Sequence, residues 1–154
     1  AYKIDGEVVS STRIREAISE GMMEEANKLL GHNYFITGIV DHGKKLGSKM
    51  GYPTANIITK DGVQLPGDGV YDTRIKVEGD DLLYKAATSI GNNPTFLGEN
   101  LKIEANILDF DENIYGKKVY LYFLKKLRPM VVFNSVEELF ERIAKDVEEV
   151  RKSK

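Results

Sequence analysis

The sequence contains no cysteine. This absence excludes a disulfide framework, a thiolate nucleophile and a zinc finger, and it fits a reducing cytosol. There is also no run approaching the roughly 20 apolar residues that a membrane helix needs, so we expect no membrane insertion. A bound metal would have to use oxygen ligands or the two histidines, His32 and His42, which have no partner at metal-ligand spacing.

The chain also lacks an excess of basic residues, because its formal net charge is -2. Proteins that track phosphate backbones are usually clearly basic, so we expect no nucleic-acid partner. The 154 residues, 42% hydrophobic and 30% charged, suit one well-packed globular domain with at most a short appendage. Because the chain starts at Ala1 without methionine or a secretory leader, we expect it to be a piece of a longer protein.

Residues 10–30 have apolar side chains at helical spacing and no β-type alternation. This pattern predicts two short helices. We expect Ser11 to cap the first helix, Gly21 to separate the two, and Gly31 to end the second.

From Tyr34 onward the apolar period changes to two, which is typical of β-strands. The runs are separated by turn-forming residues and not by helices, which favours an antiparallel barrel or sandwich. We favour a closed barrel, since closure also removes the exposed sheet edges. The expected strands cover residues 34–40, 69–77, 83–90, 102–110 and 117–127, with turns at 61–62, 66–69, 79–80, 91–94 and 109–116.

Helical periodicity returns after Asn134. Ser135 and Glu138 have the spacing of a capping box, which predicts the start of a C-terminal helix. We expect this helix to lie on the barrel through one apolar stripe, made of Val136, Leu139, Phe140, Ile143, Val147 and Val150.

The segment "KKLGSKMGYPTANI" joins a glycine-rich and lysine-rich stretch to an extended one. Pro53 favours extended backbone on both sides, so Thr54 and Asn56 should point to one side and Ala55 and Ile57 to the other. The two neutral oxygens suit a hard cation such as Mg²⁺ together with substrate phosphates. Close backbone approach and positive charge would come from the residues just upstream, Gly43, Gly47, Gly51, Lys44, Lys45 and Lys49.

The same segment also fits a lysine-rich hairpin leading into a strand with solvent-facing polar residues. Short glycine-rich loops are weak evidence, so spacing alone favours this simpler interpretation.

With its flanking blocks, the segment resembles the riboflavin kinase family. The matching blocks are "GIVDHGKKLGSKMGYPTANI", "LPGDGVYDTRI", "SIGNNPTF", "IEANILDFDENIYG", "LKKLRP" and "FNSVEELFERIAKDV", in order over roughly residues 31 to 151. The resemblance implies a mainly β fold, a six-stranded antiparallel closed barrel with a C-terminal helix. It also implies a cytoplasmic enzyme that uses ATP and Mg²⁺ to phosphorylate the ribityl 5′-hydroxyl of riboflavin, giving FMN and ADP.

The resemblance assigns roles to individual residues. Thr54 and Asn56 fall on the family's metal and phosphate positions, and Glu104 on its catalytic carboxylate. Arg128 falls on an arginine of a flap near flavin and nucleotide. The phosphate loop would comprise Gly43, Gly47, Lys49 and Gly51. Many members carry arginine where this chain has Ser48, so Lys49 would take over part of that phosphate contact.

The physical pattern around Glu104 agrees with a functional position without requiring one. Glu104 lies between Ile103 and Ala105 in an expected strand, so it points away from the face that those two residues bury. It could act as a general base at the barrel mouth, or be a solvated strand residue paired with Lys102 or Lys85. Arg128 could likewise be a surface arginine after a strand.

The leading segment "SSTRIREAISEG" resembles a signature near the end of the nucleotidyltransferase domain that precedes riboflavin kinase in bacterial bifunctional FAD synthetases. We therefore expect residues 1–30 to be a helical remnant of that domain and residues 31–154 to form the kinase barrel with its helix. Ser10, Ser11, Thr12 and Arg15 would hold phosphates in the complete domain, or Ser11 would simply cap a helix. We expect no FAD synthesis from this piece alone.

Two further features of the sequence allow a different interpretation. Asp109, Asp111 and Glu112 resemble a carboxylate cluster, but a hairpin turn explains them better. The alternative to a kinase is a binding module, either a flavin carrier without catalysis or an OB-like barrel that binds single-stranded nucleic acid through Tyr120, Tyr122 and Phe123.

Overall fold

A computed structural model describes residues 2–4, 7–9, 11–41, 54–60, 62–95, 98–110, 112–130 and 134–153. For residues 2–4, 7–9, 54, 92–95, 98–101 and 136 it describes the backbone alone. In chain order the elements are β1 (Tyr2–Ile4), β2 (Glu7–Val9), α1 (Ser11–Ser19), α2 (Met23–Leu30), β3 (Phe35–Asp41), β4 (Thr54–Ile58), β5 (Gly69–Val77), β6 (Tyr84–Thr95), β7 (Gly98–Ile107), β8 (Lys118–Arg128) and α3 (Val136–Lys152).

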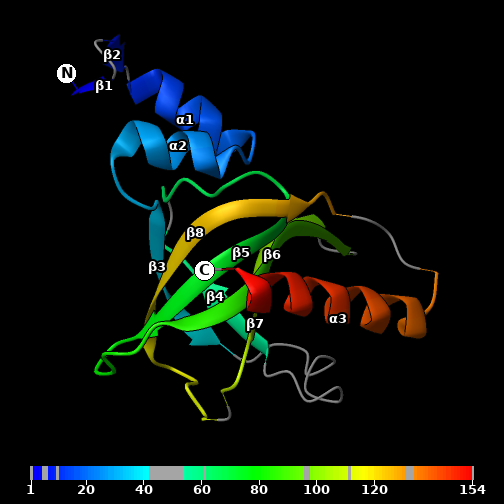
Figure 1. Cartoon of the computed structure of the whole chain (residues 1–154). Helices are drawn as coiled ribbons and strands as arrows, with labels where there is room; N and C mark the ends of the chain where they lie inside the picture. The colour runs from blue at the N-terminus through cyan, green and yellow to red at the C-terminus, as the bar shows by residue number, and fades with distance from the viewer. Residues whose placement is uncertain are drawn as a thin grey trace.

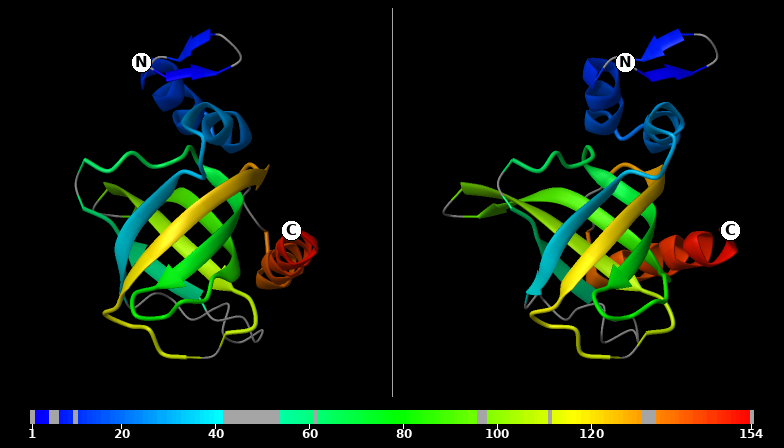
Figure 2. Two further views of the ribbon diagram at one scale, coloured as in Figure 1. Left: turned by 60° about the vertical axis from the view of Figure 1, so that its left-hand side comes forward. Right: turned by 90° about the vertical axis from the view of Figure 1, so that its left-hand side faces the viewer.

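Six of the strands form a closed antiparallel barrel in the order β3-β4-β7-β6-β5-β8. Figures 1 and 2 show the barrel from three sides. The predicted closed six-stranded barrel is therefore confirmed. Alternate residues of each strand fill the interior, because side chains alternate between the two faces of a sheet. Ala55, Ile75, Ile90, Ala105 and Leu121 are examples, each no more than 4% exposed.

The helices α1 and α2 cover one end of the barrel (Figure 1). Ala17, Ile18, Met23 and Ala26 belong to the same buried cluster as the barrel interior. Gly21 has a φ of 77° between the two helices and Gly31 a φ of 83° after α2, as predicted for a separator and a C-terminal glycine. The helical pair thus completes the hydrophobic core that the strands begin.

Asn27 fixes this cap to the barrel with both ends of its amide. Its Nδ2 donates to the carbonyl of Phe123 at 2.7 Å, and its Oδ1 accepts from the backbone N–H of Tyr34 at 2.7 Å. Gly67 also donates its N–H to the carbonyl of Ile18 at 3.1 Å. A Cβ at position 67 would lie 2.3 Å from the Ser19 carbonyl oxygen, so only glycine permits this approach.

The helix α3 lies along the outside of the barrel over β6 and β5 (Figures 1 and 2). The Ser135 hydroxyl accepts from the backbone N–H of Glu138 at 3.1 Å, which confirms the predicted helix start. Val147 and Val150 of the expected apolar stripe are buried, and they pack with Ala87 and Leu108 of the barrel region. The predicted C-terminal helix on the barrel is therefore confirmed.

Two predicted turns are wrong. Residues 91–94 do not interrupt a strand, because β6 continues to Thr95 and pairs with β7 throughout. Beyond Ile90 this extension has no pairing with β5, so Pro94, which lacks an N–H, lies on an edge where no donor is required. The segment between β7 and β8 is no hairpin either, since these strands are not neighbours; it crosses the barrel end and buries Phe110 and Ile114.

The N-terminal part differs from expectation in two details. A two-stranded sheet of β1 and β2, which the sequence pattern did not predict, precedes α1. Ser11 is the first residue of α1 and not the residue before it, so the predicted capping position is shifted by one. Among the helices of the described residues, none is long and apolar enough to cross a membrane.

Candidate active site

Asn56 and Glu104 are direct cross-strand neighbours on the outer face of the barrel. Asn56 of β4 pairs with Glu104 of β7, and the adjacent pair is Ala55 with Ala105. Both alanines point inward and are at most 4% exposed, whereas Asn56 and Glu104 are half-buried. The alternation read from the sequence is therefore confirmed, and it directs Glu104 to the outer face of the barrel.

The backbone of Thr54 pairs with that of Asn106, two residues along the same strands from the pair of Asn56 and Glu104. Positions 54 and 56 thus share one face of β4, and positions 104 and 106 share the same face of β7. Four polar residues therefore occupy a two-by-two block of adjacent sheet positions. Amide, hydroxyl and carboxylate oxygens are the donor types that magnesium accepts.

The other predicted phosphate-loop residues, Gly43, Gly47, Lys49 and Gly51, lie outside the described residues, as do Ser10, His42 and Ser48. The segment that contains the loop leads directly into β4 in the chain. Any loop contact with the polar block therefore stays a prediction. Within the described part of the chain, no three His, Cys, Asp or Glu side chains are grouped so that they could hold a metal.

Within the described residues, neither of the lysines expected as partners of Glu104 in the simpler interpretation pairs with it. Lys85 donates from Nζ to the carbonyls of Arg151 at 3.0 Å and Ser153 at 2.6 Å, so it fastens the end of α3 to β6. In the described part of the chain, no ion pair joins Glu104 to Lys102 or to any other cation.

Arg128 lies on the same transverse row of the outer face as Asn56 and Glu104. The row runs from Glu104 through Ser89 of β6 and Val70 of β5 to Arg128 of β8. At a strand spacing of about 4.8 Å, three strand steps place Arg128 roughly 14 Å from Glu104 along the sheet.

The guanidinium of Arg128 is held by a carboxylate of α3. Nε and Nη2 donate to the two oxygens of Asp146, at 2.9 and 2.7 Å. The two side chains are 9% and 8% exposed, so the pair is largely shielded from water. Arg128 therefore ties the end of β8 to the middle of α3, a contact that its position in the sequence did not suggest.

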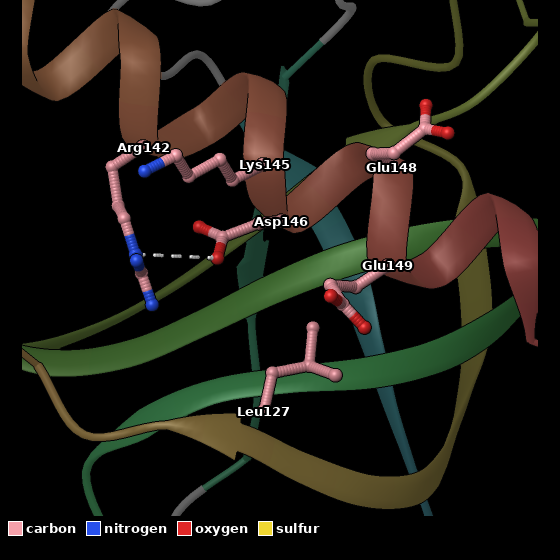
Figure 3. A pocket seen from close by; sticks show the side chains of 6 residues that line it. All are labelled: Leu127, Arg142, Lys145, Asp146, Glu148 and Glu149. Carbon is pink, nitrogen blue, oxygen red and sulfur yellow. Dashed lines mark ion pairs between the residues drawn. The ribbon is translucent and has the colours of Figure 1, made fainter.

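Asp146 also lines a pocket of about 350 Å³ between α3 and β8, shown in Figure 3. Of the predicted site residues whose side chains are described, namely Asn56, Glu104 and Arg128, none lines this pocket. In Figure 3 Leu127 points from β8 toward the helix, and the charged side chains come from α3. Among the described residues, the lining consists of Leu127, Arg142, Lys145, Asp146, Glu148 and Glu149.

Shifts in pKa fall on groups that stabilise the fold. Burial, followed by the charge of Asp68, raises the pKa of Tyr71 to about 12. A backbone hydrogen bond from Leu82, followed by one from the Tyr84 hydroxyl, lowers the pKa of Asp80. Burial also raises the pKa of Tyr34, whose hydroxyl donates to the Gln64 carbonyl at 2.6 Å.

At the N-terminal helix, Arg15 donates from Nη2 to the Thr12 hydroxyl at 3.3 Å, and both residues are exposed. The carbonyl of Arg15 accepts from Nε2 of Gln64 at 2.8 Å, which connects α1 to the loop before β5. Asp109 lies in a turn, although not in the expected hairpin, with a φ of 54°, and pairs with Arg151 at 2.9 Å.

Comparison with known proteins decides the family. The riboflavin kinase model, described as "Flavokinase", matches residues 30–154. The chain belongs to the riboflavin kinase family. The predicted family membership is thus confirmed, and the matched region covers the whole barrel and α3.

Bacterial relatives support the same assignment. The chain is 44% identical over 144 residues to a protein of Listeria monocytogenes and 40% identical over 144 residues to one of Bacillus subtilis. Both are named bifunctional riboflavin kinase/FMN adenylyltransferase. The matches cover 93% and 92% of this chain, but the chain spans only 45% of each relative.

Two solved structures share the fold. One, from Streptococcus pneumoniae and described as a macrolide-efflux protein, superposes with a TM-score of 0.89 at 40% identity, covering 99% of this chain and 49% of that one. Riboflavin kinase from Trypanosoma brucei superposes with a TM-score of 0.55 at 29% identity, covering 76% of this chain and 74% of that one.

Three residues beside the predicted site were missed by sequence reasoning. Ser89 and Asn106 lie next to Glu104 and Thr54 on the outer face, and Asp146 holds Arg128. The two-residue alternation in the strands marks positions 89 and 106 as outward, so their face could have been predicted. Their proximity to Glu104 depends on strand pairing, which alternation does not specify.

Proposed function

We propose that this chain is an ATP-dependent riboflavin kinase that transfers the γ-phosphate of ATP to the ribityl 5′-hydroxyl of riboflavin, giving FMN and ADP. Membership of the riboflavin kinase family and the names of the bacterial relatives support this activity. A barrel alone would not, because one fold serves many functions. Family membership likewise favours the kinase over a non-catalytic flavin carrier or a nucleic-acid-binding barrel.

The observation that carries the proposal is the direct pairing of Asn56 with Glu104. Phosphoryl transfer needs a group that binds the phosphates and their cation beside a group that accepts the proton of the attacking hydroxyl. The paired positions bring an amide and a carboxylate together on one half-buried surface. Position 54 adds a threonine on the same face of β4.

In this proposal Glu104 is the general base. Its carboxylate takes the proton of the 5′-hydroxyl as that oxygen forms a bond to the γ-phosphorus and the bond to the ADP oxygen breaks. General-base catalysis of this kind contributes about 10² to 10⁴ in rate.

Thr54 and Asn56 are proposed to hold Mg²⁺ with the nucleotide phosphates. The donor chemistry fits, because magnesium prefers oxygen ligands and takes few of them from protein when substrate phosphates are present. When bound, the cation would neutralise phosphate charge in the transition state. Gly43, Gly47, Lys49 and Gly51 are proposed to cradle the same phosphates.

Arg128 is proposed to act near the flavin, as the family resemblance implies. Its pairing with Asp146 gives it a fixed position between β8 and α3. In this proposal Arg128 is held rigidly at one end of the transverse row, and the general base Glu104 lies further along the same row.

The whole protein is proposed to be longer and to carry an N-terminal adenylyltransferase domain, because the named relatives are about twice as long as this chain. Residues 1–30 would then be the end of that domain, and this chain would make FMN but no FAD. We further propose a cytoplasmic location, with ATP and riboflavin as the partners and no nucleic acid.

The test is to incubate the pure chain with riboflavin, ATP and Mg²⁺ and to separate the flavins by chromatography. FMN should accumulate with ADP in equal amounts, and FAD should not appear. Glu104→Gln should keep riboflavin binding and lower turnover by about 10² or more. The matched control is Glu78→Gln, an exposed residue after β5, which should leave turnover unchanged.

A second variant tests the cation site. Asn56→Ala should weaken Mg-nucleotide binding more than riboflavin binding, because only the nucleotide is held through the cation. Equal weakening of both ligands would indicate a general disturbance of the barrel and would contradict the assigned role. A parent chain that forms no FMN under these conditions would refute the proposed activity.

A further inference from the structure

Ser89 is the second direct neighbour of Glu104. In β6 it pairs with Glu104 of β7, on the side opposite Asn56. The flanking residues Thr88 and Ile90 are both fully buried in the barrel interior, whereas Ser89 is half-buried on the outer face. Glu104 therefore lies between an amide on one side and a hydroxyl on the other.

The outward positions on either side of Ser89 in β6 are covered by apolar side chains. Ala87 is 1% exposed and packs with Val147 of α3. At Gly91, a Cβ would lie 3.2 Å from the terminal methyl carbon of Met130. On this outer face of β6, Ser89 is therefore the polar residue between two covered positions. Helix α3 covers Ala87, and the segment after β8 covers Gly91.

The Ser89 hydroxyl is not used elsewhere in the described part of the chain. In that part of the chain no hydrogen bond joins the Ser89 Oγ to the Glu104 carboxylate, and neither group has another hydrogen-bond partner there. Directly opposite residues of an antiparallel pair have Cβ atoms about 4.5–5.5 Å apart. A glutamate side chain spans such a gap, so its carboxylate can reach a serine hydroxyl on the neighbouring strand.

We propose that Ser89 is a positioning residue for Glu104: when the substrates bind, the Ser89 hydroxyl donates a hydrogen bond to the Glu104 carboxylate and orients it toward the substrate hydroxyl. This inference rests on the proposed kinase function. The acting oxygen of a general base must be held within hydrogen-bond reach of the proton that it removes, and a supporting hydrogen bond provides that restraint. Because the serine would act on the base and not on the substrate, its effect belongs to turnover and not to binding.

The test compares Ser89→Thr with Ser89→Val in the full chain. The two side chains have nearly the same shape and differ in a hydroxyl against a methyl group, and both suit a strand. Ser89→Thr should retain kcat within about twofold. Ser89→Val should lower kcat about tenfold, the effect of losing one hydrogen bond to a charged group, with KM for riboflavin and for ATP unchanged.

A second measurement separates positioning from packing. In a Glu104→Gln background the Ser89→Val change should cost no further turnover, because the carboxylate that it orients is absent. The matched control is Thr37→Val, an outward-facing hydroxyl on β3 opposite Tyr120, which should leave kcat unchanged. Thermal unfolding of each variant shows whether the barrel is intact.

The outcomes are distinct. Equal kcat for Ser89→Thr and Ser89→Val, or a full additional loss from Ser89→Val in the Glu104→Gln background, would overturn this inference alone. A parent chain that makes no FMN, or a Glu104→Gln variant as fast as the parent, would instead overturn the proposed function or its base.

Discussion

The guanidinium of Arg128 and the carboxylate of Asp146 form a two-pronged ion pair that joins β8 to α3. Both hydrogen bonds are short, 2.9 and 2.7 Å, and both side chains are almost fully shielded. Planar pairing of this kind is specific to arginine, because the ammonium of lysine cannot match both carboxylate oxygens. The pair therefore fixes the helix that borders the outer face of the barrel.

The first prediction concerns the loss of this pair. Asp146→Ala should lower the free energy of unfolding by about 3 kcal/mol, because it leaves a buried guanidinium without its counter-charge. Urea unfolding at neutral pH measures the change. The comparison variant is Arg142→Ala, since Arg142 lies 3.9 Å from Asp146 and is 39% exposed, and it should cost less than about 0.5 kcal/mol. Similar losses in both variants would contradict the importance of the Arg128 pair.

The second prediction concerns the cap of α1 and α2. Asn27→Ala removes two hydrogen bonds of 2.7 Å that connect α2 to Phe123 of β8 and to Tyr34 before β3. The free energy of unfolding should fall by about 2 kcal/mol, because two partly buried backbone groups lose their partners. Glu24→Gln, on an exposed position of the same helix, should change stability by less than about 0.5 kcal/mol. A neutral Asn27→Ala variant would show that apolar packing alone docks the cap.

Sequence reasoning predicted the elements whose evidence is local. Two-residue alternation placed Ala55 and Ala105 inside and Asn56 and Glu104 outside, and a serine three residues before Glu138 marked the start of α3. The family resemblance supplied the number of strands. Pairing between β4 and β7 could not be read from either strand, because register depends on contacts between segments far apart in the chain.

The wrong predictions have the same origin. Gly91, Asn92 and Pro94 have the chemistry of a turn, but the long pairing of β6 with β7 overrides that local preference. The segment after β7 contains turn residues, yet it crosses the barrel end because β8 belongs beside β5 and β3. The Arg128–Asp146 pair was equally invisible, since its members lie on different elements and neither one indicates the other.

A third prediction uses the close approach of Gly67 to the turn after α1. Gly67→Ala would place a Cβ 2.3 Å from the carbonyl oxygen of Ser19, and backbone atoms cannot yield as a flexible side chain does. The resulting shift should weaken the hydrogen bond from Gly67 to Ile18 and cost about 3 kcal/mol of stability. Gly62→Ala, where no atom lies within 4 Å but φ is +89°, should cost only about 1 kcal/mol of backbone strain. Urea unfolding of both variants measures the loss in free energy of unfolding for each. Equal losses would contradict a steric cause at Gly67.

The last prediction concerns the pH dependence of the turn between β5 and β6. Asp80 accepts a hydrogen bond from the Leu82 N–H at 3.0 Å and another from the Tyr84 hydroxyl at 2.9 Å. Both bonds favour the ionised carboxylate and lower its pKa in the folded protein from the usual 3.8. The contribution of Asp80 to stability is therefore fully present above pH 3.8 and is lost as the pH falls through the lowered folded pKa.

Asp80→Asn should accordingly destabilise the protein at pH 7, and its difference from the parent should narrow as the pH is lowered below 3.8, where the parent carboxylate also becomes neutral. Urea midpoints of the two proteins, measured side by side at pH 7 and at successively lower pH, test this expectation. Asp81→Asn is the matched control, because Asp81 is exposed and adjacent in the same turn. A destabilisation by Asp80→Asn that stayed constant over the whole pH range would show that its carboxylate charge contributes nothing, and that the hydrogen-bond geometry alone stabilises the turn.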